Sequence, residues 1–163
     1  MITNAQIRMV HQSGGSRRRL EMVRAEIAVQ TGVIETKDKR FPGWRWTADS
    51  TDFLRIEPPQ SENAYQRWDI VALPDGFFAV RSVVTGSYIN FSRTDHEFIF
   101  TRELGRTSEW SFDPTSDDWQ LIVYPHEPSQ ACDLYACDKT IGAWPFHWED
   151  NQYWRLVRSD GAE

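Results

Sequence analysis

Near its C-terminal end the chain reads Gln152-Tyr153-Trp154-Arg155-Leu156, a tryptophan followed two positions later by a large apolar residue. The same order occurs at Gln66-Arg67-Trp68-Asp69-Ile70 and at Ser108-Glu109-Trp110-Ser111-Phe112. The tryptophans are separated by 42 residues (68 to 110) and by 44 residues (110 to 154). A constant spacing of this size is typical of repeat architectures. We therefore predict three degenerate repeats.

Short segments rich in β-branched and aromatic residues recur between the tryptophans. Turn formers such as Pro74-Asp75-Gly76 and Thr85-Gly86 bound them, which is typical of strands in hairpins. Four strands per repeat predict an all-β domain of twelve strands. We expect these strands to close into a β-trefoil, because closure leaves few unpaired edge strands. The expected strands, besides the three tryptophan segments, cover residues 25–29, 43–46, 53–56, 77–83, 86–89, 98–101, 119–125, 131–134 and 141–144.

Length and composition favour one domain. The 163 residues, 40% hydrophobic and 13% aromatic, can bury one sizeable core. We assign residues 25–163 to the β-trefoil domain and residues 1–24 to an N-terminal extension. The extension contains Arg17-Arg18-Arg19 and is either a flexible tail or, because Ile7-Arg8-Met9-Val10 has strand character, an added edge strand.

Charge and cysteine content disfavour nucleic acid, a disulfide scaffold and a zinc site. A net charge of -6 gives no reason to expect nucleic acid. Uninterrupted apolar stretches fall far short of a membrane span, and the first 24 residues lack a secretory signal, so we expect a cytoplasmic protein. Cys132 and Cys137 are too few for a disulfide scaffold and do not form a zinc signature. We expect both thiols to be buried and reduced, and we predict no cofactor and no metal.

Sequence motifs do not favour an enzyme. The chain has no phosphate-binding glycine loop, no His-Glu-x-x-His pair and no Gly-x-Ser-x-Gly elbow. The acidic pairs Asp117-Asp118 and Glu149-Asp150 are explained by surface turns, and a glycosidase needs facing carboxylates instead. A nucleophile made of Cys132 with His147 is the weakest alternative. We therefore predict a binding protein.

The stretch from Asp150 to Trp154, with Gln66-Arg67-Trp68, resembles the Gln-x-Trp signature of the ricin-B-like β-trefoil lectins. The middle copy departs from it, with Ser108 in place of glutamine. Residues 76–89 and 141–147 resemble small fungal trefoil proteins, which include lectins and mycocypin-type protease inhibitors. The resemblance covers residues 25 to 158 and implies a carbohydrate-binding β-trefoil, with glycans or glycoconjugates as partners.

The resemblance further implies a sugar site in the third repeat. In the lectins, an aspartate at the place of Asp133 accepts hydrogen bonds from two vicinal hydroxyls, and Asn151 would supply a matching donor and acceptor. Trp144, expected after the third strand of the repeat, would stack under the apolar face of a pyranose. The alternative is that Trp144 belongs to the core and Asp133 caps a turn. The other predicted site residues are Gln152, which would orient Asp133, and His147 and Trp148, which would line the pocket.

The first and second repeats contain fewer candidate sugar-binding residues than the third. Trp68, Trp110 and Trp154 are predicted to be core residues, because large aromatics repeated in phase usually pack inside. The second repeat, with Tyr88 and Asn90, is predicted to have no site. A degenerate site in the first repeat would draw on Trp44, Trp46, Asp49 and Asn63.

The rival function is protease inhibition through proline-rich loops, at residues 57–60 or 125–128. A lectin would depend on Asp133 and Trp144, whereas an inhibitor would depend on the loops. A single sugar site would need a homodimer or an extended glycan to gain avidity. We expect Asp133→Ala to abolish sugar binding with little change in melting temperature, and Trp154→Ala to unfold the domain.

Overall fold

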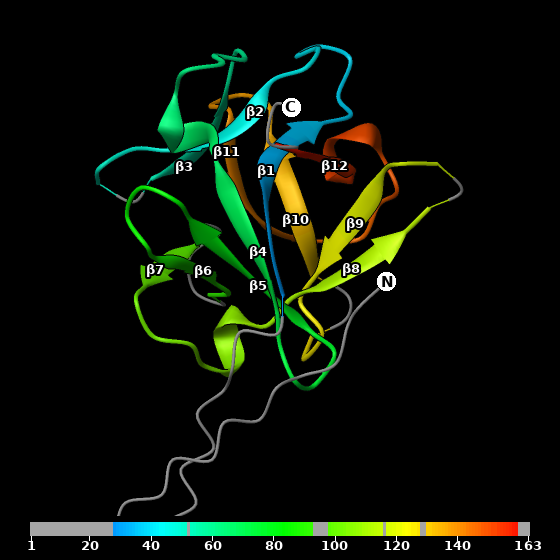
Figure 1. Cartoon of the computed structure of the whole chain (residues 1–163). Coiled ribbons are helices and arrows are strands. Elements are labelled where there is room, and N and C mark those ends of the chain that lie inside the picture. The colour runs from blue at the N-terminus through cyan, green and yellow to red at the C-terminus, as the bar shows by residue number, and fades with distance from the viewer. Residues whose placement is uncertain (1–27, 52, 93–97, 116, 128–129, 160–163) are drawn as a thin grey trace, which may run out of the picture.

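The computed structural model describes residues 28–51, 53–92, 98–115, 117–127 and 130–159 (Figure 1). The described chain is built of strands and three short 3₁₀ helices, which confirms the all-β prediction. The proposed extension, residues 1–24, lies outside the described residues. The elements are β1 (Ala28–Thr36), β2 (Arg45–Ala48), β3 (Leu54–Glu57), η1 (Ala64–Gln66), β4 (Trp68–Ala72), β5 (Phe78–Ser82), β6 (Tyr88–Asn90), β7 (Ile99–Thr101), η2 (Arg106–Ser108), β8 (Ser111–Pro114), β9 (Gln120–Val123), β10 (Gln130–Tyr135), β11 (Thr140–Pro145), η3 (Asp150–Gln152) and β12 (Trp154–Arg158).

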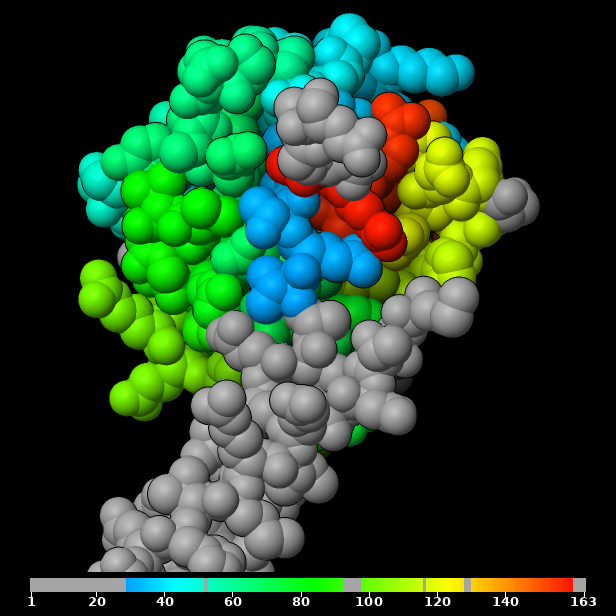
Figure 2. All heavy atoms as spheres, in the orientation of Figure 1, coloured from blue at the N-terminus to red at the C-terminus, as the bar shows by residue number. Residues whose placement is uncertain are grey.

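The strands form one twelve-stranded antiparallel sheet that closes on itself. Seven of the strands form a ring in the order β12-β9-β10-β11-β3-β2-β1, which the pairing of β1 with β12 completes. The strands β4, β5, β6 and β7 continue the sheet from β1, and β8 pairs with β9. Figure 2 shows β1 at the surface between the segments that follow it and the C-terminal strand. A Cβ on Gly32 of β1 would lie 2.3 Å from the Val157 carbonyl oxygen, so glycine permits the close approach of β1 to β12.

The first expected strand, residues 25–29, overlaps β1 at Ala28 and Val29, and residues 25–27 lie outside the described residues. Residues 25–29 lie 43 residues before residues 68–72, which is close to the repeat spacing. The structure instead pairs Ala28 with Ala72 and Val29 with Val71 as antiparallel neighbours. β1 continues to Thr36 because residues from Gly32 onward pair with β12.

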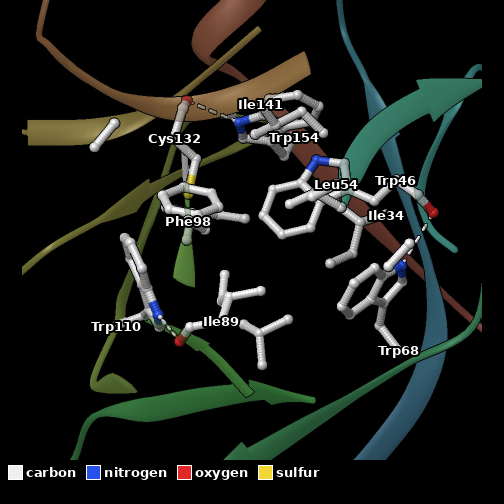
Figure 3. Packing of buried hydrophobic residues seen from close by; sticks show 14 of the residues in the cluster. Ile34, Trp46, Leu54, Trp68, Ile89, Phe98, Trp110, Cys132, Ile141 and Trp154 are labelled. Carbon is white, nitrogen blue, oxygen red and sulfur yellow. Dashed lines mark hydrogen bonds between the residues drawn. The ribbon is translucent and has the colours of Figure 1, made fainter. Parts of the chain in front are cut away.

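Four tryptophans fill the centre of the core: Trp46, Trp68, Trp110 and Trp154 (Figure 3). The Trp46 ring contacts the Trp154 and Trp68 rings edge-on, with centroids 5.2 and 5.9 Å apart. Edge-to-face contacts of this kind add to the large area that each indole buries. The core assignment of Trp68, Trp110 and Trp154 is confirmed. The possibility that Trp46 contributes to a degenerate site in the first repeat is wrong, because its indole is fully buried.

The two cysteines differ in environment. Cys132 is buried in the core, as expected, whereas Cys137 is exposed. The expectation for Cys137 is wrong because this residue lies in the turn that joins β10 to β11. The described part of the chain contains no helix with the length and apolar character of a membrane span.

Candidate functional site

The candidate site lies on the outer face of the β10–β11 hairpin. Cys132 and Leu134 of β10 point into the core, so the residue between them, Asp133, points away from it. Trp144 lies within β11 opposite Ala131, not after the strand as expected. Residues two apart in a strand share a face, so Asp133, two positions from Ala131, lies on the same face as Trp144.

Gln152, the last residue of η3, folds the chain after β11 back over this face. Its Nε2 donates hydrogen bonds to the Pro145 carbonyl oxygen at 2.9 Å and to Asp133 Oδ2 at 3.0 Å. Its Oε1 accepts a hydrogen bond from the His147 backbone N–H at 3.0 Å. A fully buried amide with three partners fixes the loop against Asp133.

Three side chains surround the Asp133 carboxylate, and the residue is 3% exposed. Oδ2 accepts hydrogen bonds from His147 Nε2 at 2.7 Å and from Gln152 Nε2, while Oδ1 accepts one from Asn151 Nδ2 at 3.2 Å. Burial raises the pKa of Asp133, and the bonds from His147 and Gln152 oppose this rise because they favour the ionised form. The structure thus brings together four of the six predicted site residues.

Hydrogen bonding around His147 identifies its tautomer. The backbone N–H of Glu149 points at His147 Nδ1 at 3.2 Å, so Nδ1 acts as an acceptor. The proton of the neutral ring is then on Nε2, where it is donated to Asp133. His147 therefore presents a donor to the carboxylate.

The other two predicted residues are exposed indoles. Trp144 is 40% exposed and Trp148 is 64% exposed, and within the described ranges they are the two tryptophans with exposed side chains. The Trp144 ring meets the Tyr135 ring edge-on at 6.1 Å, and the Trp148 ring lies 5.3 Å from that of Phe146. The exposure of Trp144 contradicts the alternative that it belongs to the core.

Tyr135 and Phe146 were missed by the sequence analysis. Strand alternation could have identified Tyr135, which is two residues after Asp133 and shares its face. Its hydroxyl donates to the Ala143 carbonyl oxygen at 3.1 Å. Phe146 gave no comparable signal, because its position depends on the path of the loop after β11.

The degenerate site considered near β2 does not assemble. Thr47 takes the place that Asp133 has in β10, and it accepts a hydrogen bond from Gln66 Nε2 at 3.2 Å. Asp49 Oδ2 instead accepts a hydrogen bond from Arg55 Nη1 at 3.1 Å. Asn63 caps η1 by accepting from the Tyr65 N–H. Trp46 lies in the core, and the side chains of Thr47, Asp49 and Asn63 make hydrogen bonds that stabilise the fold.

The corresponding position near β6 is occupied by its own hydrogen bonds. Asn90 is buried, its Nδ2 donates to Thr101 Oγ1 at 2.9 Å and its Oδ1 accepts from Thr107 Oγ1 at 3.0 Å. Tyr88 is also buried. The hydrogen bonds of Asn90 therefore join β6 to β7 and to η2.

The structure also argues against Cys132 as a nucleophile. Its thiol faces the core, on the opposite side of β10 from Asp133 and His147. Burial raises the pKa of the Cys132 thiol well above its usual value, which disfavours the reactive thiolate. Within the described ranges, no group of three or more His, Cys, Asp or Glu side chains is placed to hold a metal ion.

No protein-family model matches the sequence, and no curated protein matches it either. Solved structures do match. The chain is similar to an endo-β-galactosidase from Clostridium perfringens that releases GlcNAcα1-4Gal, with TM-score 0.71 and 13% identity over 80% of this chain and 33% of that one. The chain thus spans about a third of that enzyme.

Two further structures support the fold. A Polyporus squamosus lectin, bound to the epitope Neu5Acα2-6Galβ1-4GlcNAc, matches with TM-score 0.67 and 15% identity over 79% of this chain and 49% of the lectin. The β-trefoil protein BEL matches with TM-score 0.61 and 11% identity over 79% of this chain and 92% of BEL. These similarities show that the chain has the β-trefoil fold, which the resemblance to ricin-B-like lectins had implied.

Proposed function

We propose that this protein is a carbohydrate-binding lectin without enzymatic activity, and that its sugar site lies on the outer face of β10–β11. The observation that carries this proposal is the position of the two exposed tryptophans, Trp144 and Trp148, beside the buried polar network around Asp133. A pyranose offers an apolar face and a rim of hydroxyls. An exposed indole next to hydrogen-bonding side chains matches both features.

The roles of the individual groups follow from their chemistry. Trp144 would support the apolar face of the sugar, because its indole is anchored by β11 and still 40% exposed. Asp133 would accept hydrogen bonds from hydroxyls, and Asn151 would offer its Oδ1, which is buried and has no hydrogen-bond partner among the described residues. Gln152 would hold Asp133 in place through the hydrogen bond from its Nε2. Trp148 would extend the surface toward a second sugar residue.

The proposal includes a division of the fold into three lobes of four strands: β1–β4, β5–β8 and β9–β12. In each lobe a 3₁₀ helix precedes the last strand, and a buried tryptophan stands near the start of that strand. The residue in the place of Asp133 is Thr47 in the first lobe and Asn90 in the second. Only the third lobe would then bind sugar.

A glycan array probed with the wild-type protein and with Trp144→Ala tests this proposal. We expect the wild type to bind and Trp144→Ala to lose binding while keeping its fold. Ile99→Ala is the matched control, because Ile99 is also an exposed apolar residue on a strand but lies on β7. Equal binding by the wild type and Trp144→Ala, or binding by neither, would reject the β10–β11 site.

The second candidate is a protease inhibitor, supported by the rigidity of one loop. Pro58, Pro59 and Gln60 are exposed, yet Gln66 binds both the Pro58 carbonyl oxygen and the Gln60 N–H, at 2.9 Å each. A preorganised loop loses little entropy on binding. Inhibition of a cysteine protease that Trp144→Ala retains and a change at Pro59 abolishes would favour this candidate.

A further inference from the structure

The Asp133 carboxylate, which the proposed function assigns to the sugar, is covered by another side chain. His147 Nε2 lies 2.7 Å from Asp133 Oδ2, and Asp133 is 3% exposed. A sugar hydroxyl cannot reach Oδ2 along the direction that the imidazole occupies. Binding of a sugar to this carboxylate therefore requires one of its present partners to leave.

The geometry points to His147 as a latch over Asp133, a side chain that turns away when a glycan hydroxyl takes its place on the carboxylate. This inference rests on the proposed function and adds a specificity-determining residue to it. The hydroxyl donates to Oδ2 in place of the imidazole N–H, and the imidazole then donates to water. No covalent bond changes and no proton is transferred.

Comparison of the three donors shows why His147 is the one that leaves. Gln152 also holds the Pro145 carbonyl oxygen and the His147 N–H, and it is fully buried. Asn151 Nδ2 also donates to the Leu134 carbonyl oxygen at 3.1 Å. The His147 side chain is 30% exposed, and its second bond is a 3.2 Å contact with the Glu149 N–H. It is the least anchored of the three.

The movement needs only a rotation of the side chain. The backbone N–H of His147 is bound to Gln152 Oε1, so the main chain stays in place when the imidazole turns outward. Solvent is close, because Trp148 and Glu149, the next two residues, are both exposed. Side-chain rotations at an exposed position are fast compared with typical binding steps.

A closed latch weakens binding, because each sugar must first replace the imidazole. Removing the imidazole should therefore strengthen sugar binding. A hydrogen bond to a charged group has a net strength that corresponds to about ten-fold in affinity or more. A His147 that contacted the sugar directly would give the opposite sign, since its removal would weaken binding.

The experiment compares wild type, His147→Ala and His126→Ala by calorimetric titration with galactose, N-acetylgalactosamine, N-acetylglucosamine and mannose. His126 is the matched control, because its Nε2 also pairs with a carboxylate, that of Glu109 at 2.8 Å, away from the site. We expect His147→Ala to bind the preferred sugar about ten-fold more tightly than wild type. His126→Ala should bind like wild type.

Each other outcome has a distinct meaning. Weaker or unchanged binding by His147→Ala, with wild-type binding intact, overturns the latch and leaves the proposed lectin function standing. Binding of none of the four sugars by any variant overturns the proposed site together with the latch. A second measurement uses NMR of the wild-type imidazole. Its Nε2 proton, protected by Asp133 in the free protein, should exchange rapidly in the sugar complex, and continued protection at saturation would overturn the latch.

Discussion

The indole Nε1 of Trp154 donates a hydrogen bond to the backbone carbonyl oxygen of Cys132, 22 residues earlier in the chain, at 3.0 Å. The same bond joins Trp68 to Trp46 over 22 residues, and Trp110 to Ile89 over 21 residues. In each case the acceptor directly precedes the polar position that holds Thr47, Asn90 or Asp133. The indole hydrogen bond therefore fixes the backbone directly before this polar position.

Trp154→Ala should lower the free energy of unfolding by about 3–5 kcal/mol, because it empties a fully buried site and removes the bond to Cys132. Urea unfolding measures this change. Trp144→Ala is the control, since it shortens an indole that is 40% exposed, and it should cost less than about 1 kcal/mol. Equal decreases in the free energy of unfolding of the two variants would contradict the assignment of Trp154 to the core and of Trp144 to the surface.

The two glutamines offer a test that separates scaffold from site. Gln66 and Gln152 are both fully buried and each makes three hydrogen bonds of the same pattern, but Gln66 meets Thr47 where Gln152 meets Asp133. Alanine at either position should lower the free energy of unfolding by about 2–4 kcal/mol, since buried partners lose their bonds. Only Gln152→Ala should also weaken glycan binding. Equal glycan binding by the two variants would place the site elsewhere.

Asp133→Ala should lower the free energy of unfolding by about 1–3 kcal/mol, because Asn151 Nδ2 and Gln152 Nε2 each lose one of their two acceptors. The sequence alone led us to expect an almost unchanged melting temperature, and the burial of Asp133 is the reason why we now expect a larger change. Part of this loss of stability is offset. Burial disfavours the ionised carboxylate and raises the pKa of Asp133, which destabilises the wild-type protein, and Asp133→Ala removes that cost. A melting temperature within 1 °C or so of wild type would show that the carboxylate is more accessible than this geometry implies.

Most of the fold could be predicted from the sequence because its repeated elements are local. A tryptophan two positions before a large apolar residue and turns such as Pro74-Asp75-Gly76 mark strand positions directly. Eleven of the twelve predicted strand segments overlap strands that begin or end within two residues of them, as β4 and β10 illustrate. The extent of β1 to Thr36 was not predicted, and residues 68–72, which match residues 25–29 in spacing and composition, are the antiparallel partner of β1.

The arrangement around Asp133 could be predicted only in part. The identity of Asp133, Asn151 and Gln152 followed from the resemblance, and strand alternation places Trp144 on the same face. That His147 covers the carboxylate depends on the path of the loop from Pro145 to Gln152, which buried hydrogen bonds fix. A loop of this kind has no periodic signal, so its contacts appear only in three dimensions.

The hydroxyl of Tyr135 donates a hydrogen bond to the Ala143 carbonyl oxygen. Burial raises the pKa of Tyr135 to about 12, and the nearby charges of Asp133 and Asp138 act in the same direction. The phenol is therefore still protonated in the folded protein at a pH where the unfolded chain, with an ordinary pKa near 10, has lost the proton. The stability from this group is complete below pH 10 and is lost as pH rises toward 12.

Between pH 9 and pH 11, the free energy of unfolding of the wild-type protein should therefore fall by about 1 kcal/mol more than that of Tyr135→Phe, which has no phenol to titrate. The phenol is partly exposed, so solvent keeps the effect below the full value of about 1.4 kcal/mol per pH unit. Urea unfolding of both proteins at the two pH values measures the difference, and lysine titration cancels between them. Equal decreases in the free energy of unfolding of the wild type and Tyr135→Phe would mean that Tyr135 ionises in the folded protein as it does in the unfolded chain. The outer face of β10–β11 would then be wetter than the contacts of Tyr135 with Trp144 and Ala143 indicate.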